Sequence, residues 1–150
     1  ISPTTYSVGK KLSDAPKLLG GELEIQLRNI PLVKLLAGRL TIENNYQSII
    51  DIINQVDFNN LDENDCLDLY YWLANAYFHT GNYLEAENVI LSKMRSTIDD
   101  RFHFLLAMNY EAQGKKKSAH TEYLKFINQF PQSDYKMAAL IKSRILDRFK

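Results

Sequence analysis

Apolar side chains recur at steps of three and four residues along most of the chain, the spacing of helices that bury one face. Short polar or glycine-containing breaks separate successive runs, and no segment shows the alternation expected of a half-buried strand. The pattern predicts an all-α chain of about seven helices. The runs cover residues 22–40, 46–56, 66–81, 83–94, 100–114, 115–130 and 133–149.

The residues between these runs predict where the helices begin and end. Pro31 lies inside the first run and should end or kink a helix there, because proline lacks a backbone N–H. The polar segment 59–65 and Asp99 supply side-chain oxygens that cap the helices after them. Gly81 and Gly114 each close one helix before the next begins.

The beginning of the chain has a different composition. Its first 21 residues hold two of the four prolines and three of the six glycines, with no sustained helical period. We interpret residues 1–21 as an extended arm or linker, and residues 22–150 as one helical repeat domain. Two roles are open for the arm: a linker from a longer protein, or a segment that folds back into a binding groove of its own or a neighbouring molecule.

Two stretches of the chain repeat each other with a period of 33 residues, the distance between Gly81 and Gly114. Aligning the two glycines places residues 73–90 on residues 106–123. The positions that then match are Leu73 with Leu106, Ala74 with Ala107, Tyr77 with Tyr110 and Ala86 with Ala119. An earlier, degenerate copy is centred on Asn44, 37 residues before Gly81.

This pattern resembles the tetratricopeptide repeat, a helix–turn–helix unit of about 34 residues. The resemblance implies that the small residue after the leucine allows close helix approach and that the glycine forms the turn. The proline typical of the family is matched by Pro131, 17 residues after Gly114. The implied fold is an α-α superhelix, a tetratricopeptide-like solenoid of about three helix pairs, with residues 133–149 as a C-terminal capping helix.

A narrower resemblance lies in residues 123–140, which read YLKFINQFPQSDYKMAAL. This run is similar to repeats of bacterial cell-envelope scaffolds, of the outer-membrane assembly lipoprotein and Tol-system periplasmic coordinator types. The similarity implies a place in a bacterial envelope assembly. The similarity favours a location in the bacterial periplasm or envelope over the cytoplasm. The rest of the sequence does not indicate a compartment.

The family resemblance also implies a binding site, because the first helices of successive pairs line a concave groove that receives an extended peptide or a partner helix. The peptide-binding residues implied on these helices are Lys34, Tyr71, Trp72, Asn75, Phe78, Arg101, Phe104 and Met108. Further groove positions are Asp68, His79, Leu105 and Glu111.

Asn75 matches the asparagine with which the carboxylate-clamp branch of the family holds a peptide, and Lys34 matches a clamp lysine. Gly38 stands where the partner asparagine would be, and Phe104 where a further lysine would be. An aromatic groove with Asn75 as its polar group therefore fits an apolar peptide better than a C-terminal carboxylate. Core packing is the alternative role for three aromatic members: Tyr71, Trp72 and Phe104.

Composition limits the chemistry of the chain. It has 18 basic and 18 acidic residues and no net charge, which excludes a generic polybasic nucleic-acid binder. Its one cysteine, Cys66, cannot form an internal disulfide or a cysteine metal site. The three histidines are dispersed, and the sequence has no phosphate-binding glycine loop or serine-nucleophile elbow. We expect no enzyme, no cofactor, no metal site and no membrane span.

Charge is unevenly distributed along the chain. Residues 1–40 carry net +3, residues 41–92 carry nine acidic residues and no lysine or arginine, and residues 93–150 carry net +6. One interpretation is that helix faces of different sign are simply solvated. The other is a dipolar molecule that steers a charged partner or associates with copies of itself, through its charge or through the arm.

The residues therefore point to a protein or peptide partner rather than to nucleic acid or a membrane. We predict a non-enzymatic protein–protein interaction scaffold whose groove binds a peptide or helix of a partner. The alternative is a helical accessory domain of a larger enzyme or secretion component, with the chemistry outside these residues.

Overall fold

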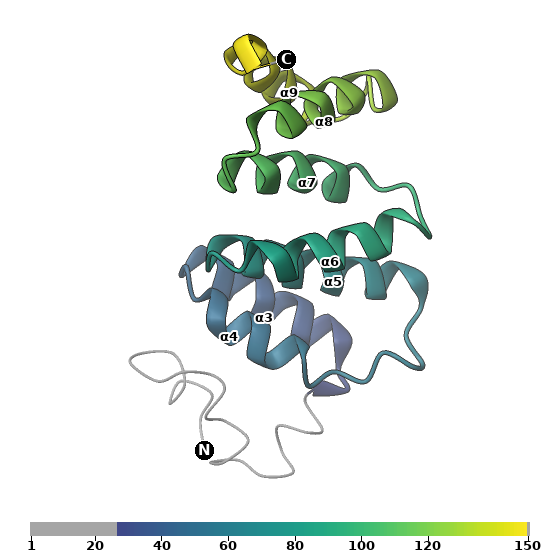
Figure 1. Ribbon diagram of the computed structural model, residues 1–150. Coiled ribbons are helices and arrows are strands. Elements are labelled where there is room, and N and C mark those ends of the chain that lie inside the picture. The colour runs from purple at the N-terminus through teal and green to yellow at the C-terminus, as the bar shows by residue number, and fades with distance from the viewer. Residues whose placement is uncertain (1–26, 150) are drawn as a thin grey trace. The chain divides into compact units, whose positions relative to one another are not determined.

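The computed structural model describes residues 27–149 and contains seven α-helices, one short 3-10 helix and no strand within them (Figure 1). The all-helical fold class is therefore confirmed. The helices are α3 (Ile30–Ile42), α4 (Tyr46–Ile53), α5 (Glu63–His79), α6 (Tyr83–Met94), α7 (Asp100–Ala112), α8 (Lys116–Gln129), α9 (Lys136–Ile145) and the 3-10 helix η3 (Asp147–Phe149). The expected arm, residues 1–21, lies outside the described residues. The chain divides into two compact units between Thr80 and Gly81.

Three interhelical turns share one backbone conformation. Asn44, Gly81 and Gly114 have φ values of 58°, 80° and 79°, in the left-handed region that glycine and asparagine tolerate best. The residue after each of them is the N-cap of the next helix, with ψ between 64° and 68°. The degenerate copy centred on Asn44 therefore has the same turn as the two copies that the glycines mark.

Small residues occupy equivalent places around these turns. Ala37, Ala74 and Ala107 each lie seven residues before a turn residue, and they are 3%, 0% and 0% exposed. Ala86 and Ala119 lie five residues after the two glycines, and both are fully buried. A methyl side chain at such a position lets neighbouring helix backbones approach closely within a dense core.

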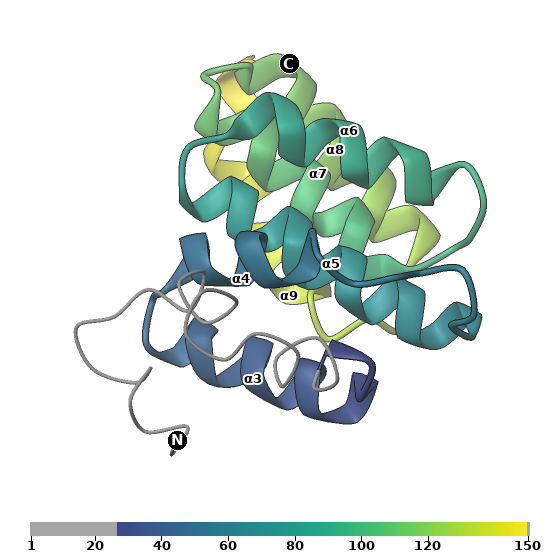
Figure 2. The ribbon, with the colours of Figure 1, turned by 90° about the horizontal axis from the view of Figure 1, so that it is seen from below.

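In the first unit, α3 and α4 both pack against α5 (Figure 2). Asn29 caps α3, because its side-chain oxygen accepts a hydrogen bond from the backbone N–H of Leu32 at 3.2 Å. The break expected at Pro31 is present, but the proline lies in the first turn of α3 and begins a helix rather than ending one. Asp62 caps α5, as the polar segment predicted, by accepting from the N–H of Asp65 at 2.7 Å.

In the second unit, α7 packs against α6 and α8, and α8 packs against α9 (Figure 1). Asp99 caps α7 as predicted, because its Oδ1 accepts from the backbone N–H of Arg101 at 3.0 Å. Aromatic rings of α7 and α8 form much of the core, with Phe102, Tyr123 and Phe126 at most 1% exposed. This packing holds the second unit together through apolar burial.

α9 begins three residues later than the sequence predicted, because Ser133 first closes a turn by accepting a backbone N–H at 3.1 Å. The inner face of α9 covers the core, as expected of a capping helix, and Ala139 there is fully buried. Its outer face is apolar, with Met137, Ile141 and Ile145 between 53% and 64% exposed. The outer surface of α9 is therefore less polar than that of a usual terminal cap, because three large apolar side chains are exposed on it.

Candidate functional site

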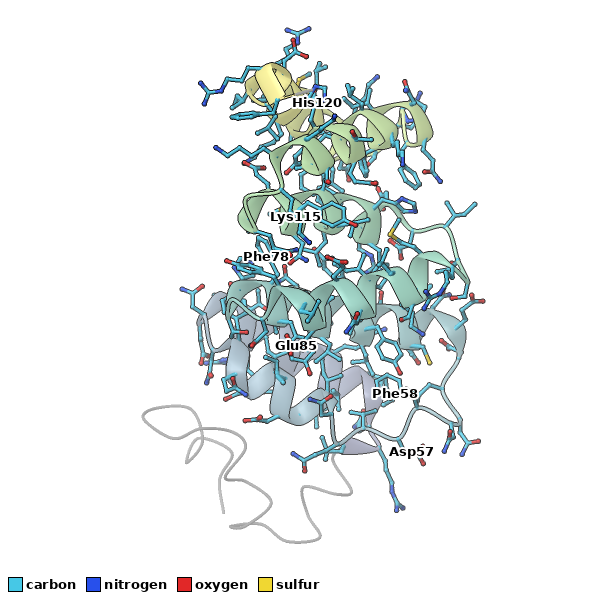
Figure 3. The ribbon with its side chains drawn as sticks, in the orientation of Figure 1. Asp57, Phe58, Phe78, Glu85, Lys115 and His120 are labelled. Atoms are coloured by element: carbon cyan, nitrogen blue, oxygen red, sulfur yellow. The ribbon has the colours of Figure 1, made fainter. Side chains whose placement is uncertain are left out.

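Of the five candidate peptide-binding residues of the first unit, all but Lys34 lie on α5, together with the further groove position His79. Tyr71 and His79 lie four residues from Asn75, and Trp72 and Phe78 lie three residues from it, so all four neighbour Asn75 on the helix surface. His79 is exposed and the other side chains are half-buried (Phe78 is labelled in Figure 3). We call these five residues the α5 face.

Asn75 supplies the polar group of the α5 face. Its side-chain amide makes no hydrogen bond with any other residue in the range 27–149, although the side chain is half-buried. An asparagine amide carries two N–H donors and a carbonyl oxygen that accepts. A peptide backbone offers the complementary carbonyl and N–H groups, so this amide can bind an extended segment at both.

Trp72 packs across Gly38 of α3. A Cβ atom on Gly38 would lie 3.9 Å from Cζ2 of the indole, so the ring covers the glycine at van der Waals distance. The rings of Trp72 and Tyr71 are tilted by 56°, with centroids 6.2 Å apart. Trp72 therefore has a packing role, and the part of the ring that stays accessible belongs to the α5 face.

Lys34 reaches α5 from α3 and binds two carboxylates there. Its Nζ lies 2.8 Å from Oδ1 of Asp65 and 2.9 Å from Oδ2 of Asp68. The hydrogen bonds to Asp65 and then Asp68 raise the pKa of Lys34 above its usual value. The lysine is thus charged and already paired with carboxylates of its own unit, which leaves it a poor clamp for the carboxylate of a peptide.

Stacked rings lie at the C-terminal end of the α5 face. The ring of His79 stacks on Tyr46 of α4, with centroids 4.4 Å apart and planes within 12°. Phe78 meets the His79 ring edge-on at 5.1 Å. Although the residue as a whole is exposed, partial desolvation of its imidazole lowers the pKa of His79 below the usual value and favours the neutral form. The α5 face therefore ends in an uncharged aromatic group.

In the second unit, the candidate residue Arg101 is bound by the cap of its own helix. Its Nε and Nη2 atoms donate to Oδ1 and Oδ2 of Asp99 at 3.1 and 2.8 Å, a two-point pairing of guanidinium with carboxylate. Both cationic candidates, Lys34 and Arg101, are thus engaged by aspartates. The sequence predicted the two cations but not their partners.

The other α7 candidates belong largely to the core of the second unit. Phe104 and Met108 pack against its buried cluster, and the Phe104 ring stacks on Tyr135 with centroids 4.9 Å apart and planes within 14°. Leu105 is only 2% exposed. Its prediction as a groove residue is wrong, because α7 is covered on more than one side and Leu105 is part of the core.

Glu111, a further groove candidate, joins three helices of the second unit. Its Oε1 accepts from the hydroxyl of the fully buried Tyr123 at 2.8 Å, and its Oε2 accepts from Nζ of Lys142 at 3.3 Å. Burial, with the hydrogen bond to Glu111, raises the pKa of Tyr123 far above its usual value. Glu111 therefore has a structural role in linking α7 to α8 and α9.

A family model described as tetratricopeptide repeat matches residues 103–133, which run from within α7 through the Gly114 turn and α8 to Ser133, four residues beyond the end of α8. The match supports the tetratricopeptide repeat family. Tetratricopeptide repeats generally mediate protein–protein interaction, and the matched segment includes Phe104 and Met108. Neither a curated protein nor a solved structure matches the chain.

Two further properties concern the part of the chain that the structure describes. No group of three or more histidine, cysteine, aspartate or glutamate side chains in residues 27–149 could hold a metal ion. None of the helices in that range is both long enough and apolar enough to cross a bilayer.

Proposed function

We propose that this protein is a non-enzymatic scaffold whose α5 face binds an extended, largely uncharged segment of a partner protein. The tetratricopeptide match supports a protein partner, since such repeats generally mediate protein–protein interaction. The observation that carries the proposal is the half-buried amide of Asn75, which has no side-chain partner among residues 27–149 and lies between aromatic residues on both sides.

In the proposed complex, the Asn75 amide donates to a backbone carbonyl of the peptide and accepts from a backbone N–H. An extended chain repeats its pattern every two residues, about 7 Å. The aromatic members of the α5 face lie about one helical turn, or 5.4 Å, to either side of Asn75. Peptide side chains flanking the bound backbone group would therefore contact Tyr71 on one side and Phe78 on the other.

The charged residues near the α5 face favour an uncharged peptide as its ligand. Lys34 is shared by Asp65 and Asp68, so the three groups together carry one negative charge next to the α5 face. In the second unit Arg101 is paired with Asp99. An acidic peptide, or one that ends in its free carboxylate at this face, would meet no unpaired cation among these residues.

The proposal also includes the candidate residues of α7 and a prediction about the assembly in which the protein acts. The half-buried residues Arg101, Phe104 and Met108 of α7 are secondary contacts for a partner. A role within a bacterial envelope assembly rests on residues 123–140 and stays a prediction.

Selection of random peptides displayed on phage against the whole protein tests the proposal. We expect the enriched peptides to be rich in apolar and aromatic residues, without a preference for aspartate, glutamate or a C-terminal carboxylate. They should lose binding to the Asn75→Ala variant and keep it for Asn88→Ala, which removes an exposed asparagine of α6. Peptides that bind all three proteins equally would place the binding site elsewhere.

A further inference from the structure

α9 has two apolar faces, of which only one is covered by its own unit. Ala139 and Leu146 are buried against the core on the inner side. On the outer side, Met137, Ile141 and Ile145 are 64%, 53% and 63% exposed. These three residues are spaced by four, so they form a continuous stripe along the helix.

The stripe is flanked by basic side chains. α9 contains Lys136, Lys142 and Arg144 and no acidic residue. At about 100° per residue, Arg144 lies beside the stripe on one side and Lys142 on the other. Lys142 binds Glu111 at 3.3 Å, whereas Lys136 and Arg144 form no ion pair with another described residue.

We propose that the outer face of α9 is a second interaction surface, which binds an amphipathic helix of a partner protein whose apolar stripe is flanked by acidic side chains. The apolar residues of such a helix would fit between those of the α9 stripe, as in other packed helix pairs. Its carboxylates would meet Arg144, which lies beside the stripe and has no partner in the described part of the chain.

A second copy of this chain that packs through its own α9 or α3 is a poorer occupant than an acidic helix. Two α9 helices packed against each other through the stripe would bring two copies each of Lys142 and Arg144, and no acidic residue of α9, into one contact. α3 is the other described helix with several exposed apolar residues, Leu32, Leu35 and Ile42, and its neighbouring charges are one basic and one acidic, Arg39 and Glu43. It offers no excess of carboxylates to α9.

This surface goes beyond the proposed function, because none of its residues belongs to the α5 face. A segment bound there would be helical and acidic, whereas the α5 face is proposed to bind an extended and uncharged segment. The two proposals can therefore fail separately. A peptide selected for the α5 face should bind an α9 variant with unchanged affinity.

Two synthetic helical peptides test the proposal on the full chain. Both carry leucines at the spacing of one helix face, and the flanking positions are glutamate in the first peptide and lysine in the second. Fluorescence anisotropy should show tighter binding of the glutamate peptide, with an affinity that falls as salt is added. Equal binding of the two peptides would overturn the proposal.

Three variants locate the binding surface. Ile141→Glu should weaken binding of the glutamate peptide by about tenfold or more, because it removes apolar contact and adds a like charge. Arg144→Glu should weaken that peptide and strengthen the lysine peptide. Leu84→Glu replaces an exposed leucine of α6, 65% accessible, and should change neither affinity. All three residues are exposed, so the thermal midpoints should stay within a few degrees of the wild type.

Two results would contradict the assignment of an acidic partner helix. The first is an Ile141→Glu variant that binds the glutamate peptide as well as Leu84→Glu does. The second is a wild-type chain that sediments as a dimer and becomes monomeric on Ile141→Glu, which would make a second copy the occupant of this face.

Discussion

Lys34 and Asp68 form an ion pair of 2.9 Å between Nζ and Oδ2, although they lie 34 residues apart in the sequence. Asp68 comes seven residues before Asn75 on α5, so the two share one side of the helix. Lys34, the residue that the family resemblance matches to a clamp lysine, is therefore already neutralised by carboxylates of the protein itself. This pairing is the reason for proposing an uncharged ligand.

Replacing Lys34 by methionine should reduce the free energy of unfolding by up to about 1 kcal/mol. The Lys34, Asp65 and Asp68 side chains are 31%, 29% and 32% exposed, so solvent weakens the pairing. Arg39→Met is the matched control, since Arg39 is 73% exposed, pairs with Glu43 four residues away at the end of α3, and should matter less. Denaturant midpoints measured at low and high salt check this, and the Lys34 effect should shrink as salt is added.

The pairing of Lys34 with Asp65 and Asp68 also makes the stability of the protein depend on pH in the alkaline range. The hydrogen bonds to Asp65 and Asp68 raise the pKa of Lys34 in the folded protein above 10.5. Since the folded pKa is the higher one, the stabilisation is complete below pH 10.5 and is lost as the pH rises through the folded value. The stability of Lys34→Met should therefore approach that of the wild type at high pH. A constant difference across this range would contradict the role of the ammonium charge.

Tyr123→Phe should destabilise the protein by about 1.5–3 kcal/mol, because the buried hydroxyl donates to the carboxylate of Glu111. The raised pKa of Tyr123 adds a pH dependence: its stabilisation is present in full below pH 10 and is lost at higher pH, where the unfolded state ionises first. Tyr46→Phe is the control, since its hydroxyl bond of 3.3 Å is exposed. An unchanged midpoint for Tyr123→Phe would show that the Glu111 bond contributes nothing.

The two glycines Gly38 and Gly114 should respond in opposite directions to alanine. Gly114 has a φ of 79°, so alanine is strained there and should cost about 1–2 kcal/mol. Gly38 lies inside α3, and a methyl group would meet Trp72 at an ordinary 3.9 Å. Gly38→Ala should therefore stabilise the protein by about 0.5–1 kcal/mol. Thermal unfolding of both variants checks the pair, and a destabilised Gly38→Ala would contradict the packing seen at Trp72.

Much of the fold could be predicted from the sequence because its turns depend on local chemistry. Left-handed residues at Gly81 and Gly114, and side-chain caps such as Asp99, act within a few residues of themselves. The turn at Asn44 was also predictable, since asparagine tolerates the same conformation. The boundaries of α4 to α8 lie within three residues of those predicted, and α6 has the limits that its apolar period predicted.

The candidate site was harder to predict because its residues are fixed by tertiary contacts. Apolar spacing alone does not tell whether the stripe with Ile141 or the face with Ala139 covers the core of the second unit. Leu105 and Leu106 are both 2% exposed although they are adjacent, because α7 is covered on more than one side. The partners of Lys34 lie more than 30 residues away, and no local rule identifies them.

The central claim is that the amide of Asn75 holds the backbone of a bound peptide. Titration calorimetry of one phage-selected peptide against the wild type, Asn75→Ala and the control Asn88→Ala tests it most directly. The account predicts that Asn75→Ala weakens binding by about tenfold, with most of the loss in enthalpy, because one donor and one acceptor to the peptide disappear. The control should bind like the wild type. An Asn75→Ala variant that binds the peptide with wild-type affinity would contradict the claim.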